Sequence, residues 1–151
     1  MTNIKEKIRQ GWIHASLVIE VVGKPAEHIE QALSLAIDKL AKERDFELIE
    51  KKLHKAKPYE GAKTLFSAFV EIEFLVDKFS RLVEIIFDYM PSSVEIIDPP
   101  DINFKLEYAN AFLNDLAMRL HQYDAMLKKL KLELTILAKR LDEMEKSGKK
   151  K

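Results

Sequence analysis

Histidines and paired carboxylates are the side chains in this sequence with the most potential for chemistry, and their spacing limits what they could do. The chain has four histidines: His14, His28, His54 and His121. No two of them are three or four residues apart, which is the spacing that two metal ligands on one helical face require. Glu71 and Glu73 alternate with apolar residues, so both carboxylates are expected on one strand face. We interpret the histidines as ordinary surface or interface residues, and the glutamates as solvated or inter-subunit residues.

Other signatures of catalysis are missing from the sequence. It has no phosphate-binding P-loop, no GxGxxG, no GxSxG nucleophile turn and no HExxH metal motif. The absence of cysteine excludes disulfides, thiolate metal sites and cysteine nucleophiles. The sequence therefore predicts a protein that is not an enzyme, with no catalytic residues, no metal ligands and no cofactor.

One basic stretch, KKLHKAKPYEGAK, could contact a phosphate group. Its basic residues are Lys51, Lys52, His54, Lys55, Lys57 and Lys63. Lysines on an edge strand commonly serve only to prevent sheets from pairing with one another, and this is the simpler interpretation. The alternative is an anion or RNA contact beside an open sheet face, to which Trp12, His14 and Phe69 could contribute.

The segment FSAFVEI, residues 66–72, bears on the RNA alternative. Ala68, Phe69 and Val70 match the consensus of RNA-recognition motifs. Ser67, however, stands where a stacking aromatic is required, and Glu71 adds an acid where the RNA backbone would run. Nucleic-acid binding is therefore kept as an alternative that the sequence does not favour.

Hydrophobic periodicity predicts the elements that must position these residues. Strict alternation predicts strands, and apolar residues at helical spacing predict helices. The expected strands are 12–23, 46–58, 64–77 and 93–98, and the expected helices are 25–44 and 78–90. Alternation in the second strand is imperfect, which predicts a bulge or an edge position. Asp77 is a candidate helix cap.

The resulting order over residues 12–98 is β-α-β-β-α-β, so the fold class is α+β with ferredoxin-like topology. We expect a four-stranded antiparallel sheet with both helices on one face and the other face open. RNA-recognition motifs, dimerisation modules and ACT-type regulatory domains share this topology, so the fold alone selects no function. The turn VVGKPAEHI resembles the ligand-binding turn of ACT domains loosely, which keeps a small-molecule regulatory domain as a further alternative.

A long helix follows, because no glycine or proline occurs between Asp101 and Gly148. Apolar residues recur there with a heptad period, which predicts a coiled coil. The a positions are Leu106, Leu113, Leu120, Leu127, Leu134 and Leu141. The d positions are Ala109, Leu116, Tyr123, Leu130, Leu137 and Met144. All of these except Ala109 are large, and we expect them to form the oligomerisation surface.

The residues that flank this seam bear on how the helices pair. In a parallel homodimer, position g of one chain meets the following e position of the other. Arg119 would then face Asp124, and Arg140 would face Glu145, both pairs of opposite sign. We therefore predict a homo-oligomer, most simply a parallel dimer, although leucine rather than a β-branched residue at every a position does not itself specify two strands. Ala125, Leu132 and Ile136 form a second apolar stripe that could receive a further protein partner.

Bulk composition sets the class of protein. The 25 basic and 25 acidic residues balance, which disfavours a protein that coats nucleic acid or an anionic membrane. No run is long and apolar enough to be a signal peptide or a membrane span, so a cytoplasmic location is expected. The predicted organisation is a polar arm at 1–11, the α+β domain at 12–100, the coiled-coil helix at 101–147 and a basic tail at 148–151.

Two segments, FDYMPSSVEIIDP and RLHQYD, resemble a conserved, uncharacterised group of small archaeal proteins. The resemblance covers most of the chain. It implies an archaeal, cytoplasmic setting, and it implies no activity, ligand or functional residue. The function that the sequence predicts is thus a non-enzymatic scaffold or adaptor, which dimerises through the C-terminal helix and recruits a macromolecular partner.

Overall fold

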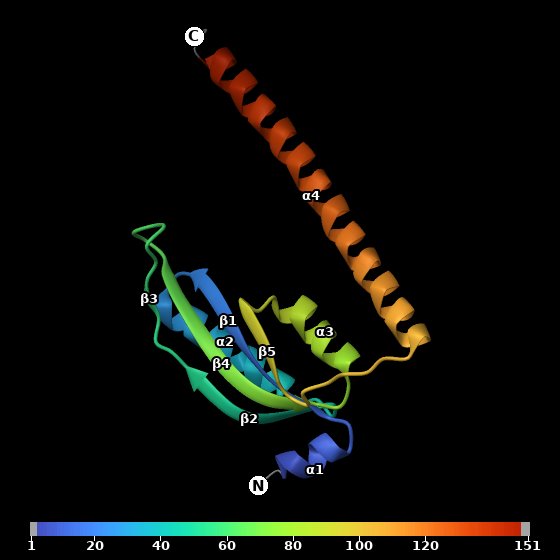
Figure 1. Cartoon of the computed structure of the whole chain (residues 1–151). Helices are drawn as coiled ribbons and strands as arrows, with labels where there is room; N and C mark the ends of the chain where they lie inside the picture. The colour runs from blue at the N-terminus through green and yellow to red at the C-terminus, as the bar shows by residue number, and fades with distance from the viewer. Residues whose placement is uncertain (1–2, 149–151) are drawn as a thin grey trace. The chain divides into compact units, whose positions relative to one another are not determined.

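The computed structural model describes residues 3–148, and the chain divides into two compact units, Met1–Ile102 and Asn103–Lys151. The first unit contains all the strands, and the second contains the long helix (Figure 1). In chain order the elements are α1 (Ile4–Arg9), β1 (Ile13–Gly23), α2 (Ala26–Leu40), β2 (Phe46–Leu53), β3 (Lys57–Pro58), β4 (Phe66–Val76), α3 (Phe79–Tyr89), β5 (Ser93–Asp98) and α4 (Leu106–Gly148). The expected basic tail lies outside the described residues except for Gly148.

The strands form one antiparallel sheet in the order β2-β4-β1-β5. The central pair is β1 and β4, which align from Ile13 opposite Val76 to Gly23 opposite Phe66 without a break. The short β3 continues along the same side of β4 as β2, so the sheet has five strands rather than the expected four. The α+β class, with an antiparallel open sheet and a long C-terminal helix, is confirmed.

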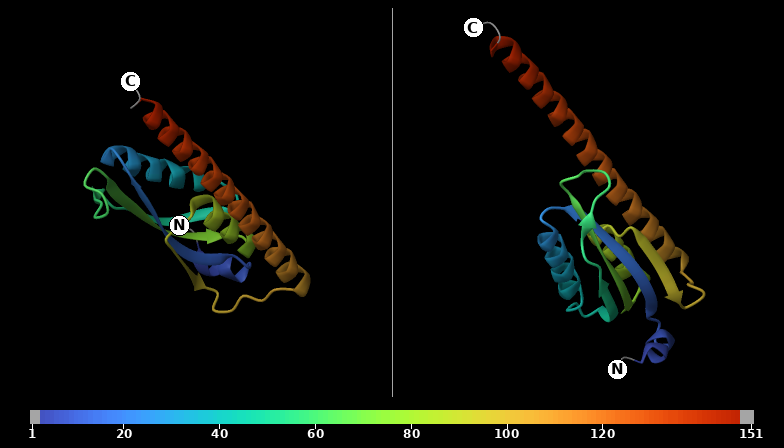
Figure 2. Two further views of the ribbon diagram at one scale, coloured as in Figure 1. Left: turned by 90° about the horizontal axis from the view of Figure 1, so that it is seen from above. Right: turned by 90° about the vertical axis from the view of Figure 1, so that its left-hand side faces the viewer.

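The core lies on one face of this sheet, because alternate residues of β1 and β4 are apolar without exception along their central parts. Ala15, Leu17 and Ile19 face it from β1 and are buried. The helices cover the same face, since Leu33 and Ile37 of α2 and Ile85 of α3 belong to the same cluster. Figure 2 shows α2 against the strands from two further directions.

The second predicted strand differs from expectation at its end. The expected irregularity is confirmed, since the register of β2 on β4 shifts between Leu48 and Glu50. The strand nevertheless stops at Leu53, and only Lys57–Pro58 pairs again. The backbone N–H of Ala56 donates instead to the Glu30 carboxylate of α2 at 2.6 Å, which satisfies that amide away from the sheet.

Two helix boundaries also differ from the sequence prediction. Asp77 does not cap α3, because Lys78 occupies the N-cap position and makes no side-chain capping bond. Asp77 instead lies 3.6 Å from the ammonium group of Lys78. The long helix begins at Leu106 rather than near Asp101, and Phe104 stacks on Tyr108 at a centroid distance of 5.2 Å where the chain enters it.

Phe74 gives the packing of the core a direct test. It is fully buried and stacks on Phe46 of β2 at 4.9 Å. Phe74→Ala should lower the free energy of unfolding by about 3–5 kcal/mol, because the free energy gained by burying the ring is lost and a cavity is left. Leu35→Ala, at a position that is 69% exposed, should change it by less than about 0.5 kcal/mol. Urea unfolding followed by circular dichroism measures both, and equal effects would contradict this packing.

Candidate interaction surfaces

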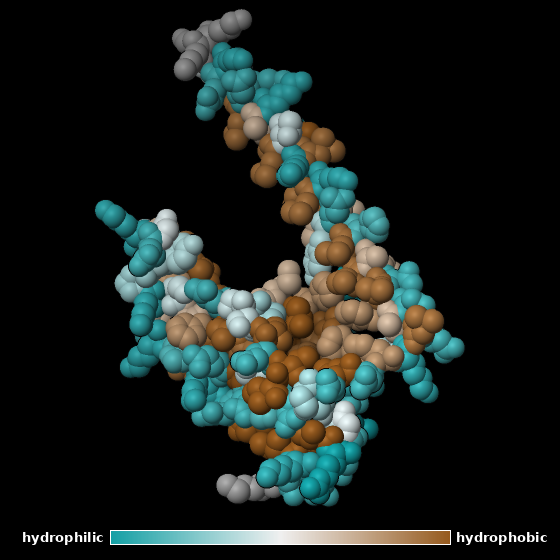
Figure 3. All heavy atoms as spheres, in the orientation of Figure 1, coloured by the Kyte–Doolittle hydropathy of each residue, from teal (hydrophilic) through white to brown (hydrophobic). Residues whose placement is uncertain are grey.

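The leucine seam of α4 is the largest apolar surface that the sequence singles out. No residue of the described helix is buried. The exposed members of the a and d positions are Leu106, Leu113, Leu120, Leu127, Leu130, Leu134, Leu137, Leu141 and Met144. Leu116 and Tyr123 are of intermediate exposure. Apolar side chains recur along α4 between hydrophilic ones in Figure 3. The structure thus joins the predicted oligomerisation residues into one stripe on one helix.

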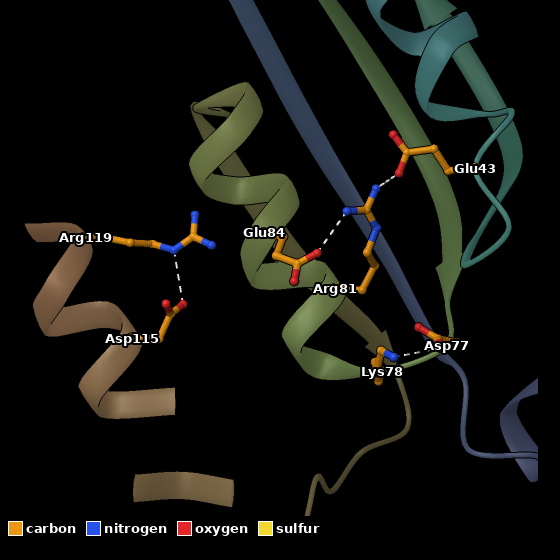
Figure 4. A network of polar contacts seen from close by, with 7 residues as sticks. All are labelled: Glu43, Asp77, Lys78, Arg81, Glu84, Asp115 and Arg119. Atoms are coloured by element: carbon orange, nitrogen blue, oxygen red, sulfur yellow. Dashed lines mark hydrogen bonds and ion pairs between the residues drawn. The ribbon is translucent and has the colours of Figure 1, made fainter. Parts of the chain in front are cut away.

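Charged residues of α4 lie outside the seam and stabilise the helix by pairs one turn apart. The ammonium of Lys128 lies 2.6 Å from the Asp124 carboxylate, and that of Lys146 lies 2.7 Å from Asp142. Arg119 pairs with Asp115 at 3.1 Å (Figure 4). Each such pair adds only tenths of a kcal/mol, so it maintains the helix without specifying a partner. Within the described residues, neither Arg140 nor Glu145 of the seam's flanks has an ion-pair partner.

The second apolar stripe of α4 is narrower than the seam. Met118 and Leu132 are exposed and lie at f positions, on the side of the helix opposite a and d. Ile136, at a c position, is 43% exposed. These side chains are separated by charged residues such as Lys129, so the stripe is interrupted where the seam is continuous.

The sheet face away from the helices is acidic. The strand register places Glu73 beside Ser16 and Glu50, and Glu71 beside Val18 and Lys52. Glu20 and Glu95 lie on the same face in the flanking rows. A depression of about 90 Å³ among these residues is much smaller than an ordinary ligand site. The predicted carboxylate pair, Glu71 and Glu73, therefore belongs to a broad acidic surface.

The predicted basic stretch does not form one patch, because strand alternation sends its members to both faces. Lys51 points to the helix side, where its ammonium lies 2.6 Å from Asp38 and 3.0 Å from the Ser34 hydroxyl. Lys52 lies on the acidic face, 3.3 Å from Glu50. His54 stacks on Phe69 at 4.1 Å, and its Nε2 lies 3.1 Å from Glu71.

The remaining basic residues of that stretch are at the end of the sheet. Lys55, Lys57 and Lys63 are exposed, and none of them is within ion-pair distance of a described carboxylate. The single predicted set is thus divided into three residues with acidic partners and three without. The two lysines within β2 have partners, whereas the three lysines without partners all follow the end of that strand.

The three residues predicted for the open face differ in exposure. His14 is only 8% exposed, so the expectation of an accessible contact is wrong for it. Its Nε2 lies 2.7 Å from a Glu73 oxygen, a partner that sequence spacing could not reveal. Trp12 is half-buried beneath the ammonium of Lys7, which lies 3.8 Å from its ring and also pairs with Glu47 at 3.2 Å. Phe69 is half-buried under His54.

An ion-pair network links α3 to the turn that follows α2. Arg81 lies between Glu84, at 3.0 Å, and Glu43, as Figure 4 shows. Its side chain is 13% exposed, so these carboxylates satisfy a largely buried charge. The neighbouring groove of about 410 Å³ also contacts Tyr89, and burial raises the pKa of that phenol. We interpret the network as a structural contact between α3 and the turn after α2.

The described residues contain neither a metal-binding cluster nor a membrane-spanning helix. Between residues 3 and 148, no three histidine, aspartate or glutamate side chains are grouped to hold a metal ion. His28 and His121 are exposed and far apart in the chain. No helix in the same range combines the length and apolarity needed to cross a bilayer.

Comparison with known proteins identifies a family. The family model described as the MJ0538 family matches residues 14–149, which is most of the chain. No curated protein and no solved structure matches the sequence or the fold.

The pair of Lys51 and Asp38 makes a testable electrostatic prediction. The hydrogen bond from Lys51 holds the pKa of Asp38 below its usual value of 3.8. A lowered folded-state pKa stabilises the fold above the unfolded value, and this contribution is lost as pH falls through the folded pKa. Lys51→Gln should therefore raise the Asp38 pKa in an NMR titration, whereas Lys52→Gln should leave it unchanged. If the Asp38 pKa is the same in the wild type and in Lys51→Gln, the pair does not persist in solution.

Proposed function

The chain belongs to the MJ0538 family, and we propose that it acts as a non-enzymatic scaffold that homodimerises through the seam of α4 and recruits a macromolecular partner. The exposure of the seam carries this proposal. Every residue from Asp124 to Gly148 is exposed, including Leu127, Leu134 and Leu141. Single-chain proteins rarely leave so long an apolar stripe in water, and burying one such leucine contributes on the order of 2 kcal/mol.

A second copy of the same chain fits the seam better than an arbitrary partner would. A straight helix of this kind extends about 1.5 Å per residue, and a copy of equal length and equal repeat can cover the whole stripe. Isolated helices gain most of their stability from the packing of an apolar face, and the pairs within α4 add little by comparison. Self-association therefore accounts for both the length of α4 and the regularity of its leucines.

The flanking charges favour a parallel arrangement. When the two helices are parallel, Arg140 at position g meets Glu145 at the following e position of the second copy. Neither residue has an ion partner within its own described chain, so both are available for this contact. Arg119 and Asp124 form the second g–e pair of opposite sign, in addition to their bonds within the helix. The absence of any like-charged g–e pair removes a source of repulsion.

We also assign the first unit to the ferredoxin-like class, on the strand order β2-β4-β1-β5 with both helices on one face. That order is the one that a split β-α-β arrangement generates when the extra β3 is set aside. The depression on the acidic sheet face holds only about 90 Å³, much less than an ordinary metabolite site, which favours a scaffold over a small-molecule sensor. A cysteine-free chain of this composition is suited to the cytoplasm.

Single charges in the seam test the dimer. Leu127→Asp and Leu134→Asp should each halve the mass in solution, from twice 17.5 kDa to 17.5 kDa, because an unpaired carboxylate would be buried at the interface. Leu132→Asp makes the same substitution on the opposite side of the helix and should leave the mass unchanged. Light scattering coupled to size exclusion measures all three. A wild-type mass of 17.5 kDa in solution, or a dimer mass that neither seam variant lowers, would refute the dimer.

The orientation of the helices can be tested separately, because the protein has no cysteine of its own. Met144→Cys places a single thiol at a d position near the end of α4, and in a parallel dimer the two thiols face each other. Mild oxidation should then join most of the dimer covalently on a denaturing gel. Lys139→Cys, at an f position, should crosslink little. A dimer in which Met144→Cys fails to crosslink would indicate antiparallel helices.

A further inference from the structure

The strand register brings Lys24 to the end of the sheet that carries Lys57, with Lys55 just before β3 and Lys63 in the loop after it. The strand register places Gly23 and Pro58 on either side of Phe66. Adjacent strands are about 4.8 Å apart, so these flanking residues are about 10 Å from each other. Lys24 follows Gly23, and Lys57 precedes Pro58. We call Lys24, Lys55, Lys57 and Lys63, together with Tyr59, the basic end; it lies where the loop between β3 and β4 projects in Figure 1.

The four ammonium groups have no carboxylate partner among the described residues. Among the nearby acids, Glu20 accepts a hydrogen bond from Ser67 at 2.5 Å and Glu30 accepts one from the Ala56 amide. Glu60, in the same loop as Tyr59, and Glu27, three residues after Lys24, are exposed acids that offset part of the positive charge. The four lysines contrast with Lys51 and Lys52, which are each paired with an acid of their own. The basic end therefore keeps an excess of positive charge in a protein whose net charge is zero.

An exposed aromatic ring lies within the same group of lysines. Tyr59 is 41% exposed, and its backbone N–H donates to the Leu65 carbonyl at 2.9 Å, which closes the loop. The ring packs so closely on Gly61 that any side chain there would collide with it. Tyr59 is therefore held in position by its own loop with one side available to solvent.

We propose that the basic end binds single-stranded nucleic acid, with the lysines contacting phosphates and Tyr59 stacking on a base. Positive charge that follows a backbone, together with a stacking ring, is the chemistry by which proteins hold single strands. Lys24 was not part of the basic stretch that the sequence indicated, and the sheet register adds it. The surface involved is the end of the sheet, and the acidic face is excluded from it.

The neighbouring acids favour a flexible single strand over a flat anionic surface. Glu20 is four residues before Lys24 along β1, which is roughly 13 Å in a strand. A flat anionic bilayer that touched the basic end would also approach the exposed carboxylate of Glu60, which lies in the same loop as Tyr59, while Glu20 lies only slightly beyond the Debye length of about 10 Å. A single strand can bend around the end of the sheet and avoid those carboxylates.

The experiment measures binding of the full-length protein to fluorescent 12-nucleotide RNA and DNA, a length of about one ordinary binding site. The logarithm of the affinity should fall with the logarithm of salt concentration with a slope of about −0.7 per phosphate contact, so four contacts give about −3. The variant with Lys24, Lys55, Lys57 and Lys63 all changed to Gln should lose at least tenfold in affinity at 50 mM salt, because counterion release from phosphate contacts contributes strongly at low salt. Tyr59→Ala should weaken binding without changing the slope.

A double variant with Lys51→Gln and Lys52→Gln is the matched control, because these lysines belong to the same stretch but have acidic partners. It should bind as the wild type does. No binding at low salt, or an equal loss in the control, would overturn the proposal. Tighter, lysine-dependent binding to phosphatidylserine vesicles than to either oligonucleotide would overturn it as well. Leu127→Asp should keep binding to these short strands, so failure of the dimer and failure of this site are distinguishable.

Discussion

The uninterrupted antiparallel pairing of β1 with β4 is the interaction on which the rest of the first unit depends. Because side chains alternate across a sheet, a fixed register commits every residue of both strands to one face or the other. One face receives Leu17, Ile72 and Phe74 and is covered by α2 and α3. The other receives Glu71 and Glu73. A shift of one residue would bury those glutamates and expose the core, so this register cannot change without unfolding the unit.

The second unit obeys a different constraint. A helix on its own has no interior, and the side chains of α4 between Asp124 and Gly148 are all exposed. Charged pairs such as Lys128 with Asp124 keep the helix formed, but they leave the free energy of its leucines in water unchanged. An apolar seam with a heptad period can be buried only by another helix of similar repeat. The first unit buries its apolar residues within the chain, whereas the seam of α4 stays exposed on the described chain and, in the proposed dimer, would be buried against a second copy.

Local pattern predicted the elements that alternation and helical periodicity define, and failed where a distant residue decided the outcome. The strand at 93–98 and the irregularity of β2 follow from local sequence, and both are present. The end of β2 depends on Glu30, which captures the Ala56 amide from another element. His14 is buried because Glu73, far along the chain, provides its hydrogen-bond partner. The sequence contains both partners in each case, but their proximity is a property of the fold.

The same distinction separates two kinds of lysine that look alike in sequence. Lys51 and Lys52 are adjacent, yet alternation directs one toward Asp38 of α2 and the other toward Glu50. Their charges are neutralised within the unit, so they serve the fold. Lys24 and Lys57 are far apart in sequence, yet the pairing of β1 and β3 with the start of β4 brings them to one end, where neither has an ion-pair partner among the described residues. Unpaired lysines are well solvated in water, so they do not destabilise the fold. Their contact with a polyanion is favourable, because each phosphate contact also releases a bound counterion. The fold of the sheet thus separates a balanced set of charges into an acidic face and a basic end. An anionic partner would gain the most binding free energy at the basic end.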